Sequence, residues 1–368
     1  MLDVHPAFSL TTDTWLAGFE GRYLSDFVPS GGSVVRFVSG SDAALERVRT
    51  GLQQIAGQRN FHYRFLNADK PTADGRPPQL HRIERFYAAV TENVDWQDWA
   101  REQARNVLER LGLHIPPGTS LGDIQAIAEA NKADRDYLIQ QYKGEARRSV
   151  QDRSMTVEFR NAITNLWVDQ LLPDTSTPGR SDVLTAWLRG ETLPPGGARV
   201  LKGCQIYGRI SSINARHYLV SFCEWTRRVG RAGVLIVLDF RAYERTGSAS
   251  NRPNGTLAAS KSASEQGAPI EELRRRLQDS GSEAAPLRYS KKPYEQMLSL
   301  LRRFIDEVDR FPSLALIVLT SLQYSGNDDR VRRYTDYVAL NTRIGNEVAD
   351  KNRPNPDAAL VRLSEDTL

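Results

Sequence analysis

The amino-acid sequence predicts an α/β protein whose parallel-sheet core is interrupted by a large all-α insertion. The first 92 residues alternate between strand and helix patterns, an order typical of a parallel sheet covered by helices. Residues 96–188 show helical periodicity and no convincing strand. Two later runs, Gly233–Asp239 and Ser313–Thr320, are continuously apolar, as expected of strands buried on both faces of a parallel sheet.

Residues 1–92 are predicted to form the first part of this core. A β-branched apolar run after the turn signal at Pro29–Gly32 indicates a buried strand, and Asp42 can cap the helix that follows it. A second strand and a helix with one apolar face come next. The expected strands are Ser33–Val38 and Phe61–Leu66, and the expected helices are Asp42–Gly57 and Leu80–Val90.

Residues 93–198 are predicted to be the all-α insertion. Prolines at Pro116, Pro117 and Pro173 break the helical pattern, and Pro194–Gly197 closes the insertion as a linker. The expected helices are Trp96–Leu111, Leu121–Ala130, Ala133–Val150, Val157–Leu172 and Val183–Leu188. Their tryptophans are expected to pack inside the fold.

Residues 199–368 are predicted to complete the α/β core. Around the two apolar strands we expect helices at Gln205–Val229, Tyr294–Asp309 and Arg332–Val348, and a last strand at Ala358–Leu363. Between the strands, residues from about 246 to 285 are rich in Ser, Gly, Ala and Asn. This composition indicates a flexible surface loop, with one short charged helix at Glu271–Gln278.

Composition excludes several classes of protein. With 40% hydrophobic and 26% charged residues, the 368-residue chain is not a disordered one. Its apolar runs, such as Val234–Leu238, are far too short to span a membrane, and the N-terminal pattern predicts no export. Cys204 and Cys223 lack metal-ligand spacing and cannot form a disulfide framework, which fits a reducing cytoplasm. No zinc-protease, nucleophile-elbow or dinucleotide-binding motif is present.

The ends of three strands carry residues that could form a nucleotide site. Ser39, Gly40 and Ser41 lie between the first strand and a helix, where P-loop proteins hold phosphates. Asp239 ends an apolar strand like the carboxylate that holds Mg²⁺ in such proteins, and Thr320 ends the other central strand. An aspartate in this position is more often simply a turn former.

This candidate ATP and Mg²⁺ site departs from an active one. The loop is truncated, and no lysine occurs between Ser39 and Gly57 to hold the phosphates. Asp42 would repel phosphate, and Phe240 and Arg241 stand where a catalytic glutamate is expected after Asp239. We therefore expect a degenerate P-loop with ATP hydrolysis absent or negligible.

A basic stretch is a second candidate site. Residues 198–245 hold nine basic and three acidic residues, a local charge of +6 in a chain whose net charge is +4. The candidate contacts to DNA or phosphate are Arg209, Arg216, Arg227, Arg228 and Arg231, with a second group at Arg332 and Arg333 beside Tyr334 and Tyr337. In a helix from Gln205, Arg209 and Arg216 would share one face. The alternative is that these arginines are solvated or pair with acidic neighbours inside the fold.

Several segments resemble the ATP-binding proteins of bacterial BREX-type phage-defence loci. They are Pro29–Val38, Leu80–Tyr87, Ile206–Arg209, Gly233–Asp239 and Tyr334–Ile344. The resemblance covers roughly residues 25–92 and 200–363. It implies an AAA+-like P-loop fold, a possible ATP and Mg²⁺ cofactor, and other defence subunits as partners, although the usual intact phosphate loop is missing here.

Together these features predict a non-catalytic or weakly catalytic AAA+-like subunit of a cytoplasmic anti-phage complex. It would contact DNA or partner proteins through its basic face, and could form a homo-oligomer. Two alternatives remain open: an active ATPase with a non-standard phosphate loop, and a pure protein scaffold. Nucleotide binding with and without Mg²⁺ distinguishes the non-catalytic subunit from the active ATPase. Salt-dependent DNA binding distinguishes the non-catalytic subunit from the pure scaffold.

Overall fold

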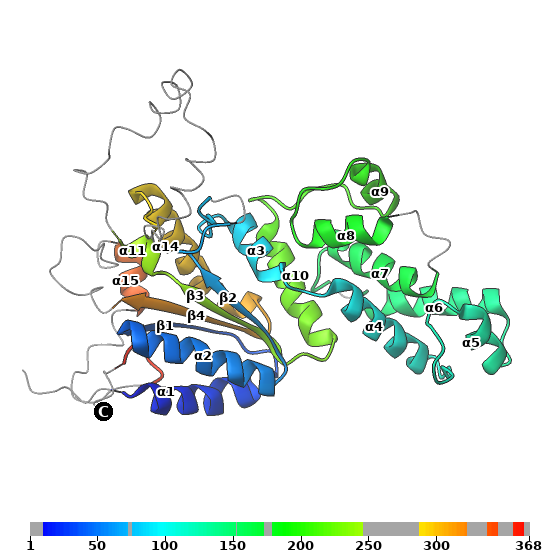
Figure 1. Cartoon of the computed structure of the whole chain (residues 1–368), viewed down its shortest axis with the longest axis horizontal. Helices are drawn as coiled ribbons and strands as arrows, with labels where there is room; N and C mark the ends of the chain where they lie inside the picture. The colour runs from blue at the N-terminus through cyan, green and yellow to red at the C-terminus, as the bar shows by residue number, and fades with distance from the viewer. Residues whose placement is uncertain are drawn as a thin grey trace, which may run out of the picture.

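A computed structural model of the chain contains a five-stranded sheet in the order β2-β3-β4-β1-β5, with every neighbouring pair parallel (Figure 1). The structure describes residues 10–72, 76–151, 153–172, 179–245, 287–321, 337–344 and 356–363. The strands are β1 (Val34–Gly40), β2 (Phe61–Asn67), β3 (Gly233–Asp239), β4 (Leu314–Ser321) and β5 (Leu360–Arg362). The predicted α/β class with a parallel sheet is confirmed.

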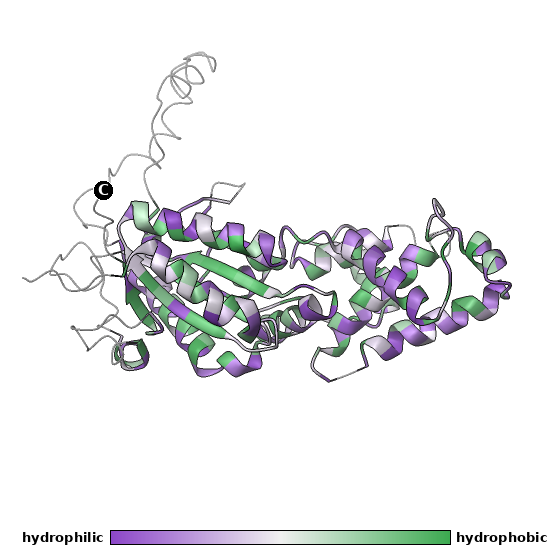
Figure 2. Cartoon of the chain, turned by 90° about the horizontal axis from the view of Figure 1, so that it is seen from below, coloured by the Kyte–Doolittle hydropathy of each residue, from purple (hydrophilic) through white to green (hydrophobic). Residues whose placement is uncertain are grey.

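The two continuously apolar runs form the centre of this sheet. Every residue of β3 is buried, and so is every residue of β4 except Ser321. Figure 2 shows these strands as hydrophobic ribbons enclosed by helices with one polar and one apolar side. The burial on both faces explains why neither strand alternates between polar and apolar residues.

Helices cover both faces of the sheet because successive strand side chains point to opposite sides. Leu235 and Val237 of β3 belong to an apolar cluster with helices α1 (Thr12–Phe19) and α2 (Asp42–Gln58). Ile236 and Leu238 belong to a second cluster on the other face. Its helices are α3 (Ile83–Thr91), α10 (Ala215–Arg228), α14 (Lys291–Asp306) and α15 (Val338–Ile344). Helix η1 (Glu20–Phe27) extends α1, and the short helix η3 (Val308–Arg310) follows α14.

Six helices between α3 and α10 extend to one side of the sheet (Figure 1). They are α4 (Trp96–Arg110), α5 (Ile124–Ala130), α6 (Arg135–Ser149), α7 (Val157–Leu171), α8 (Arg180–Leu188) and α9 (Gly197–Gly203). Buried tryptophans Trp96, Trp167 and Trp187 belong to the same apolar cluster as α3 and α10, so this helical block shares a core with one face of the sheet. No helix in the described part of the chain is long and apolar enough to cross a membrane.

The structure corrects the predicted helix Gln205–Val229. Helix α10 begins only at Ala215, and residues 206–210 have no regular secondary structure. The side chain of Asn214 accepts from the Ser211 backbone N–H and donates to the Arg209 carbonyl, which favours a turn over a helix. Arg209 and Arg216 therefore do not share a helix face.

Other differences lie at the N-terminus and around the insertion. Helices α1, η1 and α9 were not expected from the sequence pattern. The predicted loop from about 246 to 285, its helix Glu271–Gln278 and the start of the predicted helix Arg332–Val348 lie outside the described residues.

Candidate nucleotide site at the carboxyl edge of the sheet

The helices described after β1 and β4 pack on opposite faces of the sheet. The chain runs from β1 into α2, whose apolar residues pack on one face, whereas α15, the helix described after β4, packs on the other face. In α/β proteins, ligands bind at the carboxyl ends of adjacent parallel strands whose following helices lie on opposite faces of the sheet. The structure places Ser39, Gly40 and Thr320 at this point, with Asp239 at the same edge on the neighbouring strand β3.

The turn between β1 and α2 contains a single residue. Strand β1 ends at Gly40, helix α2 starts at Asp42, and Ser41 caps the helix by accepting a hydrogen bond from the Ala44 N–H at 3.3 Å. A Cβ atom on Gly40 would lie 3.3 Å from Ala44 Cβ and 3.5 Å from Leu363 Cβ. This turn is too short and too closely packed to wrap around phosphates as a glycine-rich loop does.

Arg241 binds Asp239, the carboxylate that the sequence suggested as a Mg²⁺ ligand. Its Nε donates to Asp239 Oδ1 at 2.9 Å, and its Nη2 donates to Asp239 Oδ2 at 2.6 Å. The remaining Nη1 pairs with Asp42 at the start of α2. Asp239 is only 4% exposed, so the guanidinium neutralises a buried charge. The hydrogen bond to Asp239 is the main cause that raises the pKa of Arg241.

These contacts decide whether a Mg²⁺–nucleotide fits the residues as they are arranged. Asp239 has the oxygen donors that Mg²⁺ prefers, but both oxygens already accept from Arg241. A divalent cation would have to displace a guanidinium from them. The arrangement therefore does not fit a bound Mg²⁺ while Arg241 is engaged.

Glu244 is a buried acid at this edge that the sequence analysis did not select. It ends the short helix α11 (Arg241–Glu244), is 1% exposed, and its Oε2 accepts from the Ser321 backbone N–H at 2.9 Å. Its Oε1 is buried without a hydrogen-bond partner among the described residues. Burial raises the pKa of Glu244 to about 7. The sequence gives only a weak indication of this site, because Glu244 is simply an acidic residue five positions after the aspartate that ends β3.

Two buried hydroxyl groups bond to the carbonyl at the end of β4, and one of them comes from β1. Ser39 Oγ donates to the Ser321 carbonyl at 3.2 Å, and Thr320 Oγ1 donates to the same carbonyl at 3.3 Å. Both side chains are buried. The Ser39 hydrogen bond thus joins the carboxyl ends of β1 and β4, whereas the Thr320 bond lies within β4.

The arginines of the predicted basic face lie in different environments. Arg216 pairs with Glu307, and Arg227 and Arg228 both pair with the buried Glu224. Arg231 donates to the Asn60 side chain and lies over the Trp99 ring. Arg209 is exposed and has no ion pair in the described part of the chain, and Arg332 and Arg333 lie outside it.

Comparison with known proteins gives one match. A family model described as "BREX system ATP-binding protein BrxC/D" matches residues 25–244. This range covers more than half of the chain, from η1 to the end of α11, and includes Asp239, Arg241 and Glu244. No curated protein and no solved structure matches the chain.

Proposed function

Because this chain belongs to the family of BREX system ATP-binding proteins BrxC/D, we propose that it is a subunit of a BREX phage-defence system that does not hydrolyse ATP. The engagement of Asp239 by Arg241 carries this proposal. Hydrolysis of ATP needs a metal that bridges the phosphates and a group that orients the attacking water. Here Asp239, the carboxylate predicted to hold the metal, is paired with a guanidinium, and no lysine follows β1 up to Gly57.

The test is a measurement of nucleotide binding and turnover by the purified protein, with and without Mg²⁺. We expect no gain in nucleotide affinity on adding Mg²⁺, and turnover far below about 1 s⁻¹, the low end of ordinary enzymes. Turnover at or above that rate, lost in Asp239→Asn, would refute the proposal. That result would establish the alternative, an active ATPase with a non-standard phosphate loop.

We also propose that the subunit contacts DNA or partner subunits through its basic surface. The charge of +6 in residues 198–245 supports this, although Arg216, Arg227 and Arg228 balance acidic neighbours within the fold. Arg209 is the member of the predicted set that remains exposed and without an ion pair among the described residues. DNA affinity that falls with salt supports a DNA contact, and affinity absent at low salt leaves the scaffold alternative.

A further inference from the structure

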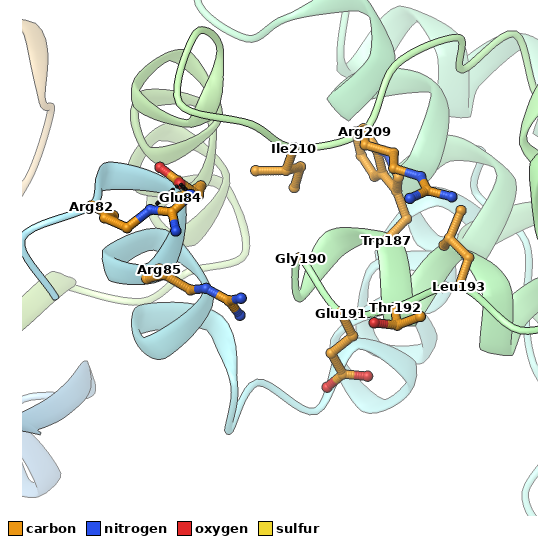
Figure 3. Close-up of a pocket in the computed structure, with 10 residues that line it drawn as sticks. All are labelled: Arg82, Glu84, Arg85, Trp187, Gly190, Glu191, Thr192, Leu193, Arg209 and Ile210. Atoms are coloured by element: carbon orange, nitrogen blue, oxygen red, sulfur yellow. Dashed lines mark hydrogen bonds and ion pairs between the residues drawn. The ribbon is translucent and has the colours of Figure 1, made fainter. Parts of the chain in front are cut away.

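We propose that a cavity between α3 and the segment before α10 binds a phosphate group of single-stranded nucleic acid. The inference rests on the proposed DNA contact and assigns it a location and a class of ligand. The cavity has a volume of about 220 Å³ and is lined by Arg82, Arg85 and Arg209, among other residues. Figure 3 shows Arg85 on α3 pointing toward Gly190 and Glu191, and Arg209 on the facing segment with its guanidinium extending toward Leu193.

Charge pairing leaves two of the lining guanidiniums free. The cavity also contains two carboxylates, Glu84 and Glu191. Glu84 pairs with Arg82 at 2.6 Å, and Glu191 lies 3.9 Å from Arg189. Arg85 and Arg209 are exposed, and neither forms an ion pair with another described residue.

Two free guanidiniums on either side of a cavity suit a phosphate. Guanidinium N–H groups match phosphate oxygens in a bidentate geometry. Both side chains line the cavity and are exposed, so each can turn toward an anion bound there. The cavity therefore presents positive charge from two arginines that form no ion pair with another described residue.

The segment that carries Arg209 is held in place by hydrogen bonds. Trp187 Nε1 donates to the Gly208 carbonyl at 2.8 Å, and Asn214 Nδ2 donates to the Arg209 carbonyl at 3.0 Å. Since Trp187 is buried, it anchors the segment to the helical block. The backbone that presents Arg209 is thus positioned before any ligand arrives, which lowers the entropic cost of binding.

The same segment exposes apolar surface next to the arginine. Tyr207 is 74% exposed and Ile213 is 88% exposed. Tyr207 precedes Arg209 by two residues, and an exposed aromatic ring near a phosphate-binding arginine offers a surface on which an unpaired base can stack. A cavity of about 220 Å³ is also smaller than the roughly 300–1,000 Å³ of ordinary small-molecule sites. These two facts favour one phosphate of a longer single strand over a free nucleotide.

The test is binding of fluorescently labelled oligothymidylate over a range of salt concentrations. We expect the Arg85→Ala, Arg209→Ala double variant to bind about tenfold more weakly or worse at low salt, with a salt slope smaller by about 0.7, the value for one lost phosphate contact of a single strand. Arg147→Ala is the matched control, because Arg147 is exposed on α6, far from α3 in Figure 1, and should bind like the unaltered protein. Tyr207→Ala should weaken binding about fivefold or more, whereas Tyr207→Phe keeps the ring and should not.

The outcomes separate this inference from the proposed DNA contact. If the unaltered protein binds oligothymidylate and the Arg85, Arg209 and Tyr207 variants bind it equally well, the assigned site alone is overturned. The same holds if Arg147→Ala lowers the affinity as much as those variants do. No binding of oligothymidylate even at low salt overturns this inference, and no binding of duplex DNA under the same conditions overturns the proposed DNA contact as well. Displacement by thymidine monophosphate at equal phosphate concentration would show that the cavity takes small phosphates, against the single-strand assignment. Urea unfolding of each variant checks that the fold is intact, since neither exposed arginine has a structural ion pair to lose.

Discussion

Replacing Glu244 by Gln should change how the stability of this protein depends on pH. Burial raises the pKa of Glu244 from 4.5 to about 7 in the folded protein. Between these values the folded protein holds a proton that the unfolded chain has released. The free energy of unfolding therefore falls as pH rises from about 4.5 to 7, and the loss is complete above the folded pKa.

The size of this loss follows from the difference between the two pKa values, at 1.36 kcal/mol for each pH unit. It amounts to about 3 kcal/mol between about pH 5 and pH 8.5. Gln keeps an oxygen that can accept from the Ser321 N–H and carries no charge at any pH. The variant should match the natural protein near pH 5 and be about 3 kcal/mol more stable near pH 8.5.

Urea unfolding of both proteins across this pH range measures the effect. Buried His62, whose pKa is lowered to about 4, opposes Glu244 by losing stability as pH falls below 6.5. Because His62 is present in both proteins, its contribution cancels in their difference. A stability difference that does not change with pH would refute the reasoning, since it would mean that Glu244 stays ionised in the fold.

Three further predictions follow from packing and ion pairing. Arg241→Ala should lower the free energy of unfolding by about 3 kcal/mol because it leaves the buried Asp239 unpaired, and adding Asp239→Asn should recover much of that loss in a double-mutant cycle. Gly233→Ala should lower the free energy of unfolding by about 2 kcal/mol or more, because its Cβ would lie 2.4 Å from the Ser313 carbonyl oxygen. Gly144→Ala, on the open face of α6, should instead raise it by about 0.5–1 kcal/mol. Chemical denaturation compares the two variants, and equal effects would contradict the clash at Gly233. Buried Cys223, whose thiol pKa is strongly raised by burial, should resist a thiol reagent until the protein unfolds, and fast labelling of the native protein at this residue would contradict its burial.

Local sequence patterns predicted much of the secondary structure and the parallel arrangement of the sheet. Helices α4 to α8 and strands β3 and β4 lie close to where periodicity and apolar runs predicted them, because those patterns depend on neighbouring residues alone. The same patterns do not distinguish a helix from a turn where a side chain competes for backbone hydrogen bonds. Asn214 does so before α10, and the predicted start at Gln205 was ten residues too early.

The state of the candidate site depended on contacts between distant parts of the chain. By itself the sequence determined that Ser39, Asp239 and Thr320 end strands of one parallel sheet, since buried parallel strands have a recognisable composition. Only the tertiary structure decided that Arg241 bridges Asp239 to Asp42, almost 200 residues earlier in the chain. Charge pairing depends on distance in space and on burial, neither of which a local pattern encodes. For the same reason, only the fold distinguishes the free Arg209 from Arg216, which pairs with Glu307.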